Sequence, residues 1–148
     1  MKIALLLLAL LLLAGVPAYF SMRELSPEEK LLLLQKKVEP QGGVVLQTEL
    51  QGKKMNFLLL DCELFLLDSS GKEIDQTKVL RAGFYFWLTG CTGQSIRREG
   101  EYLMVNLENR AIGAGGGNTT GGLYRSKDGV DWEKRFGGKW RPVDEVQQ

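Results

Sequence analysis

The chain has 148 residues, with 19 basic and 18 acidic side chains and no histidine. This length suffices for one domain with a hydrophobic core, and the balanced charge argues against nucleic-acid binding, which needs a clustered basic surface. Without histidine, Ser-His-Asp and Cys-His catalysis and His-ligated zinc or haem sites are excluded. We therefore expect a non-catalytic protein with no metal and no other cofactor.

The N-terminus is strongly apolar. Lys2 precedes an unbroken apolar run over residues 3–14, and small residues follow at the spacing of a cleavage site after Ala18. This pattern is typical of a secretory signal peptide covering residues 1–18. Because a spanning helix needs about 20 apolar residues, an uncleaved membrane anchor reaching to about residue 22 is the alternative. Either way, we expect the rest of the chain outside the cytoplasm, in the bacterial periplasm or held there by the inner membrane.

Residues 19–42 are expected to form a linker and one short helix. Residues 26–29 combine a serine N-cap, a first-turn proline and a capping-box glutamate, which predicts a helix from about Pro27 to Val38. Its block of four leucines, residues 31–34, is apolar on more than one face. We expect this helix to pack on the following sheet; a partner-binding or membrane-lying helix is the alternative.

From residue 43 to residue 148 the sequence changes to short apolar alternations separated by turn residues. About seven antiparallel strands are expected, which implies a sandwich or a partly open barrel. The predicted strands are residues 44–50, 55–61 within an alternating stretch that reaches residue 68, 79–89, 101–107, 123–126, 132–136 and 140–143. Asp128-Gly129 is the strongest hairpin signal among the turns between them.

Two cysteines, Cys62 and Cys91, raise the question of a disulfide. A bridge would close a loop of about 30 residues and stabilise the fold by roughly 3–4 kcal/mol on the chain-entropy model. Alternation places the two cysteines on unlike sides of their strands unless a bulge at Gly90 reverses one of them. A disulfide is the favoured expectation. Two separate buried thiols, or a metal or catalytic thiol, are the alternatives.

Residues 113–122 form the most glycine-rich segment of the chain. The candidate ligand contacts in it are Gly115, Gly116, Gly117, Asn118 and Thr119. Glycine permits positive φ and close approach to the backbone, so this loop could form a nest of amides around an anion. A crossover loop without a ligand is the simpler interpretation. Residues 118–120 also match a glycosylation acceptor, which matters only in a eukaryotic secretory pathway.

Residues 126–132 read Ser-Lys-Asp-Gly-Val-Asp-Trp. This segment resembles the Asp-box hairpin of sialidases and other β-propeller proteins, with a turn one residue shorter. The resemblance covers seven residues and occurs once, so it implies a structural turn and not a propeller. It implies that Ser126 and Asp128 bond the turn backbone while Trp132 packs beneath. No sialidase activity follows, because that family's catalytic arginines and tyrosine cannot be placed in this chain.

Aromatic residues near this turn suggest a second kind of surface. Tyr124, Trp132 and Trp140 could contribute to a stacking platform for sugar rings, although packing in the core or in hairpins is the commoner role of such residues. The carboxylates Asp128 and Glu133 lie on one hairpin with Asp131. Catalytic carboxylate pairs flank a cleft from different elements, so we expect these acids to belong to a solvated turn.

Together these patterns predict an exported binding module of the bacterial envelope with a protein partner, in an inhibitor, immunity or assembly role. Binding of a cell-wall glycan or small ligand is the alternative, followed by a hydrolase that works without histidine. No nucleic-acid partner is expected. Membrane contact is expected only through an uncleaved N-terminal segment. The surfaces proposed for binding are residues 113–122 and 124–140.

Overall fold

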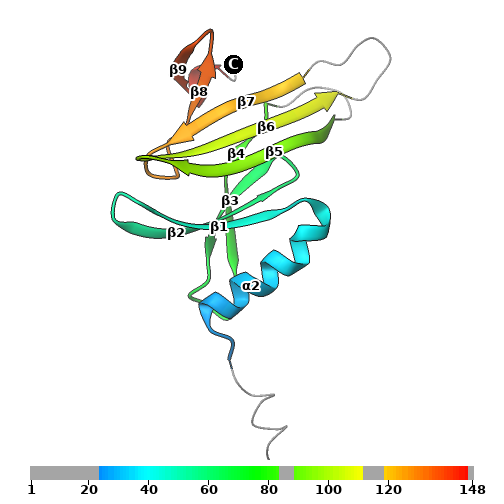
Figure 1. The fold of residues 1–148 in the computed structure, drawn as a ribbon, viewed down its shortest axis with the longest axis vertical. Coiled ribbons are helices and arrows are strands. Elements are labelled where there is room, and N and C mark those ends of the chain that lie inside the picture. Colours follow the sequence, from blue (N-terminus) through cyan, green and yellow to red (C-terminus); the bar gives the residue numbers. More distant parts are fainter. Residues whose placement is uncertain (1–23, 84–88, 112–118, 147–148) are drawn as a thin grey trace, which may run out of the picture.

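The structure is a computed structural model that describes residues 24–83, 89–111 and 119–146. It contains two antiparallel sheets that face each other, and in each sheet the strands lie in chain order (Figure 1). The first, sheet A, consists of β1 (Val44–Leu50), β2 (Lys53–Leu60), β3 (Glu63–Asp68) and β4 (Asp75–Arg81). The second, sheet B, consists of β5 (Thr89–Glu99), β6 (Tyr102–Ala111), β7 (Thr119–Ser126), β8 (Glu133–Phe136) and β9 (Lys139–Pro142).

The predicted class is confirmed as an antiparallel sandwich. The sheets do not close into a barrel, and the described residues hold nine strands where about seven were expected.

The helix before the sheets, α2 (Pro27–Val38), has the predicted boundaries. The Ser26 hydroxyl accepts the backbone N–H of Glu29 at 3.2 Å, and the Glu29 carboxylate accepts the N–H of Ser26 at 2.8 Å. This reciprocal capping box satisfies two donors that the helix itself leaves free. A 3-10 turn, η1 (Glu39–Gln41), then leads into β1, and a four-residue helix, α3 (Val143–Val146), follows β9.

Sheet A is apolar on both faces because a different layer covers each of them. On one face Leu58 and Leu67 pack against Leu31 and Val38 of α2. The other face packs on sheet B through a cluster that includes Phe57, Leu59, Leu64, Leu103, Val105 and Leu107. Figure 1 shows the resulting order, with α2 on the side of sheet A that lies away from sheet B. A strand buried on both faces has no polar side, which explains the nearly continuous apolar run of β2 and β3.

The prediction of one alternating stretch over residues 56–68 is wrong. The chain reverses at Asp61 and Cys62, so that Leu60 pairs with Glu63. Both turn residues have positive φ, 55° and 59°, as a tight two-residue hairpin turn requires. The usual pairs in such turns are Asn-Gly, Asp-Gly and Gly-Gly, and Asp61 is followed by Cys62 and not by glycine.

The predicted disulfide is confirmed: Cys62 and Cys91 are bridged, with their Cα atoms 5.4 Å apart. It joins the β2–β3 turn to the start of β5 and therefore ties sheet A to sheet B. The objection from strand alternation fails because Cys62 lies in a turn, and the bulge in β5 falls between Cys91 and Gly93, not at Gly90. Next to the bridge, the Gln94 side chain accepts the N–H of Cys62 at 2.9 Å and donates to the carbonyl of Gly42 at 2.8 Å.

The prediction of a central strand over residues 79–89 is also corrected. Its first residues end β4, which is an edge strand of sheet A, and β5 begins at Thr89. Residues 84–88 lie outside the described residues. The start of β4 was missed for two reasons. Residues 75–78 are polar, and a bulge in β4 opposite Leu64 and Phe65 interrupts the alternation of apolar and polar residues.

We expect reduction of the bridge to lower the free energy of unfolding by about 3–4 kcal/mol. The bridge joins two residues that are 29 positions apart and so reduces the conformational entropy of the unfolded chain. Urea unfolding of the protein with and without dithiothreitol measures this difference. The variant carrying both Cys62→Ala and Cys91→Ala is the control, and its unfolding curve should not respond to dithiothreitol. An unchanged midpoint for the wild-type protein under reducing conditions would contradict the expectation.

Candidate functional site

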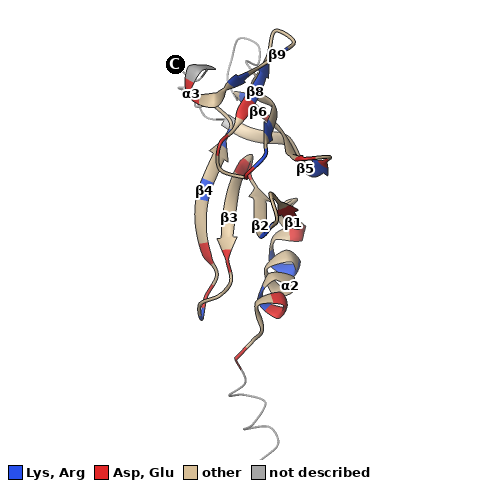
Figure 2. Ribbon diagram, turned by 90° about the vertical axis from the view of Figure 1, so that its left-hand side faces the viewer, with Lys and Arg blue, Asp and Glu red and all other residues tan. Residues whose placement is uncertain are grey.

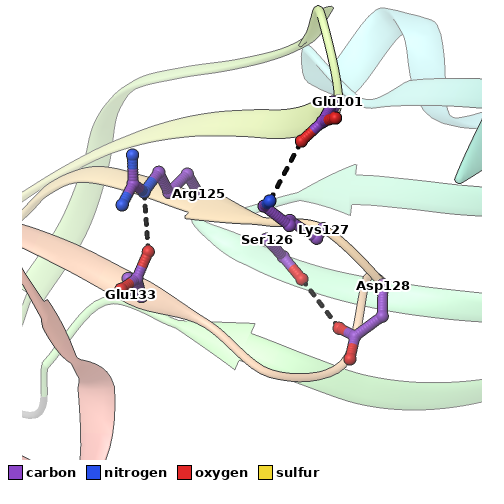
Figure 3. Close-up of polar contacts among 6 residues, drawn as sticks. All are labelled: Glu101, Arg125, Ser126, Lys127, Asp128 and Glu133. Atoms are coloured by element: carbon purple, nitrogen blue, oxygen red, sulfur yellow. Dashed lines mark hydrogen bonds and ion pairs between the residues drawn. The ribbon is translucent and has the colours of Figure 1, made fainter. Parts of the chain in front are cut away.

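The turn between β7 and β8 is held by two of its own side chains. Asp128 accepts the backbone N–H groups of Val130 and Asp131, each at 2.9 Å. The Ser126 hydroxyl donates to Asp128 at 3.0 Å, as Figure 3 shows, and accepts the N–H of Gly129 at 2.8 Å. Trp132 is buried directly after the turn. The structural implications of the Asp-box resemblance are therefore confirmed.

Gly129 fits this turn closely against sheet A. Its φ is +79°, and a Cβ atom placed on it would lie 2.5 Å from Cζ of Phe57 and 3.1 Å from Cε of Met55. Only glycine suits both the conformation and the space. The turn is thus seated on sheet A, and it fixes the position of the strands on either side of it.

The negative charge of Asp128 stabilises the hydrogen bonds that hold this turn. Burial acts to raise the pKa of its carboxyl group, but the hydrogen bonds from Val130, Asp131 and Ser126 outweigh that effect and hold the pKa below its usual value. Asp128 is therefore an ionised acceptor inside the turn. Its oxygen Oδ1 already accepts three hydrogen bonds, which leaves it poorly suited to proton transfer.

Beside the turn, one arginine is stacked between two aromatic rings. The guanidinium carbon of Arg125 lies 4.3 Å from the ring centre of Trp140 and 4.5 Å from that of Tyr102. Its Nε donates to the Glu133 carboxylate at 2.6 Å, a pair drawn in Figure 3. We call Tyr102, Arg125 and Trp140 the Arg125 stack. Each of the three side chains is partly exposed.

The stack is assembled by strand register. Arg125 of β7 lies opposite Met104 of β6 and Glu133 of β8, while Trp140 of β9 lies opposite Arg135. Side chains alternate between the two faces of a strand. Because Leu103 and Tyr124 point into the core, their neighbours Tyr102 and Arg125 lie on the solvent face of sheet B.

Charged residues surround the stack. Lys127 lies 5.1 Å from the Tyr102 ring centre and donates to Glu101 at 2.9 Å, also drawn in Figure 3. A hollow of about 310 Å³ opens here, lined by Tyr102, Arg125, Ser126, Lys127, Asp128, Asp131 and Glu133. Both signs of charge line it. Figure 2 shows the same mixture of acidic and basic residues on α2, on β4 and around β8.

A larger groove of about 580 Å³ lies on the other side of the turn. Residues 78–81 of β4 line one wall, and residues 130–133 and 142–144 line the other. Glu133 lines both hollows. The two hollows therefore adjoin each other at the turn, and Tyr102 and Arg125 of the stack line the smaller one.

The structure separates the residues that the sequence proposed for binding. Tyr124 and Trp132 are buried in the core, so they are not available as a stacking platform and that part of the prediction is corrected. Trp140 lies at the surface in the Arg125 stack. Thr119 is exposed at the start of β7. The remaining predicted contacts, Gly115, Gly116, Gly117 and Asn118, lie outside the described residues.

Arg125 and Tyr102 were not among the predicted site residues. Neither residue belongs to a recognisable motif. Their relation to Trp140 depends on the pairing of four strands, β6 to β9. One signal in the sequence bears on Tyr102. Side chains alternate along a strand, so if Leu103 and Val105 point into the core, Tyr102 lies on the outer face.

Within the described ranges, no group of three or more cysteine or acidic side chains is arranged to hold a metal ion. No helix among these residues is both long and apolar enough to cross a membrane. No protein-family model matches the chain, and comparisons with curated proteins and with solved structures found no match.

We expect Asp128→Ala to lower the free energy of unfolding at pH 7 by roughly 1.5–3 kcal/mol, because hydrogen bonds to a charged acceptor are lost. The folded-state pKa is lowered, so the stabilisation is present above the unfolded pKa of about 3.9 and is lost as the pH falls through the folded value. Urea unfolding between pH 7 and pH 2 should show the difference between wild type and variant shrinking on acidification. A constant difference would rule out this role for the charge.

Tyr124→Phe is expected to leave stability at pH 7 unchanged or raise it by up to about 1 kcal/mol, because the buried hydroxyl has no hydrogen-bond partner among the described residues. Burial raises the pKa of Tyr124 to about 12. The wild-type protein should therefore lose stability as the pH rises from about 10 towards 12, since the unfolded chain ionises first. This alkaline loss should be smaller in Tyr124→Phe. A large loss of stability in the variant at pH 7 would indicate a bonded hydroxyl.

Proposed function

We propose that this protein is an exported, non-catalytic module that binds a protein partner of the cell envelope through the Arg125 stack. The observation that carries the proposal is the stack itself. Tryptophan, tyrosine and arginine are the residues that most often dominate the binding energy of protein interfaces. Here one of each is gathered at a single partly exposed position on the solvent face of sheet B.

The stack is held in place before any partner arrives. Arg125 is restrained by two rings and by its ion pair with Glu133. Each flexible side chain ordered on binding costs roughly 0.5–1.5 kcal/mol, and part of that cost is already met in the free protein. The charged pair Glu101 and Lys127 lies at the margin of the stack. An aromatic centre with a charged margin is the usual anatomy of a protein interface.

The surroundings of the stack favour binding over catalysis. Asp128 is committed to the turn backbone, and Glu133 is paired with Arg125. The chain has no histidine that could serve as a general base near neutral pH. Export is supported by the apolar N-terminus and by the disulfide, which fits an oxidising compartment.

The packing of Arg125 against the rings of Tyr102 and Trp140 favours a protein partner over a glycan. Arg125 lies over a face of Trp140 and a face of Tyr102, faces on which a sugar ring would otherwise stack. The terminal guanidinium nitrogens make no hydrogen bond to the described residues. They suit carboxylates or backbone carbonyl groups of a partner.

The test compares Trp140→Ala with Phe136→Ala, a matched control because Phe136 is 58% exposed on the same β8–β9 hairpin. Each full-length, C-terminally tagged variant is cross-linked in its native envelope, and the adducts are identified by mass. We expect a specific partner with the wild type and with Phe136→Ala, and a loss of roughly 30-fold in affinity for Trp140→Ala, the size of a hot-spot truncation.

Two results would count against the proposal. One is a partner that Trp140→Ala binds as tightly as the wild type, with both proteins giving the same circular dichroism spectrum. The other is retention on purified cell wall that Trp140→Ala abolishes, without any protein adduct. The second result would establish the glycan alternative at the same residues.

A further inference from the structure

Helix α2 carries an apolar surface that the rest of the described chain does not cover. Leu31 and Val38 face sheet A and are 3% and 4% exposed. Leu32 and Leu33 point away from it and are 56% and 51% exposed, and Leu25 just before the helix is 45% exposed. We call these three residues the leucine face. Three large aliphatic side chains left open along one short segment indicate a contact surface.

The leucine face lies next to the N-terminal segment of the chain. Figure 1 shows α2 at one end of the long axis, with β8 and β9 at the other. Residues 1–23 join the domain at the α2 end, and they include the apolar run of residues 3–14. The leucine face therefore begins 11 residues after the end of this apolar run, at Leu25.

We propose that the N-terminal segment is retained as a membrane tether and that the leucine face rests on the surface of the lipid bilayer. A short tether gives an effective concentration in the millimolar range, so that even the weak affinity of three exposed leucines suffices for docking. Lys36 and Lys37 lie one turn beyond Leu32 and Leu33. Their long side chains allow the ammonium groups to reach lipid headgroups while the leucines enter the interface.

Docking in this way would have two consequences. The apolar surface that an untethered domain would expose to water is covered by lipid. The Arg125 stack lies on the outer face of sheet B, on the far side of the sandwich from α2, and is directed away from the membrane. The inference stands on α2 and on the N-terminal sequence alone, and it does not require the partner proposed for the stack.

Photolabelling tests the contact directly. Full-length protein is reconstituted in vesicles of phosphatidylethanolamine and phosphatidylglycerol that contain a lipid with a diazirine in its acyl chain. After irradiation, lipid adducts are mapped by peptide mass spectrometry. We expect adducts in residues 3–20 and at Leu32 and Leu33, and none at Phe136 or Val130, which are as exposed as these leucines but lie in the sheet B half of the molecule. Labelling of Leu32 and Leu33 no stronger than that of Phe136 overturns the proposal.

A paired variant and the native mass complete the test. In the double variant Leu32→Ser, Leu33→Ser, labelling of α2 should fall on the order of tenfold while labelling of residues 3–20 is unchanged. The matched control Val130→Ser should label α2 as the wild type does. The protein isolated from its native membrane should retain residues 1–18, and an intact mass that lacks them overturns the tether. Because these readouts are independent of Trp140, failure here leaves the proposed protein interface untouched.

Discussion

The rest of the structure depends on the fact that the centre of sheet A is apolar on both sides. Its central hairpin, β2 and β3, carries Phe57 and Leu59 on one side and Leu58 and Leu67 on the other. Neither side can face water without a large hydrophobic penalty. Sheet B covers the side with Phe57 and Leu59, and α2 covers the side with Leu58 and Leu67. The chain supplies α2 before sheet A and sheet B after it.

This layering decides where binding chemistry can lie. Both sides of the β2–β3 hairpin are covered, whereas the outer face of sheet B carries exposed or partly exposed side chains of β6, among them Tyr102, Asn106 and Glu108. The seating of Gly129 on Phe57 fixes the turn that follows β7. Arg125 directly precedes Ser126, the first residue of this turn, so the contact of Gly129 with Phe57 also helps to position Arg125.

Local features were predictable from the sequence, and features that depend on pairing were not. The limits of α2 follow from Ser26 and Glu29, a signal contained within four residues. The turn at Asp61 and Cys62 was missed because positive φ there is stabilised by context and not announced by glycine or asparagine. The meeting of Tyr102, Arg125 and Trp140 depends on the register of four strands, which alternation alone does not supply.

The strand order has a consequence for how the protein acquires its structure. Among the described strands, every hydrogen-bonded pair is formed by neighbours along the chain, so each sheet is a meander completed within its own stretch of sequence. Such local pairing incurs little loop-closure entropy and is typically fast. The contacts between the two meanders join parts of the chain that are far apart in sequence, and the bridge between Cys62 and Cys91 adds a covalent link between sheet A and sheet B to these contacts.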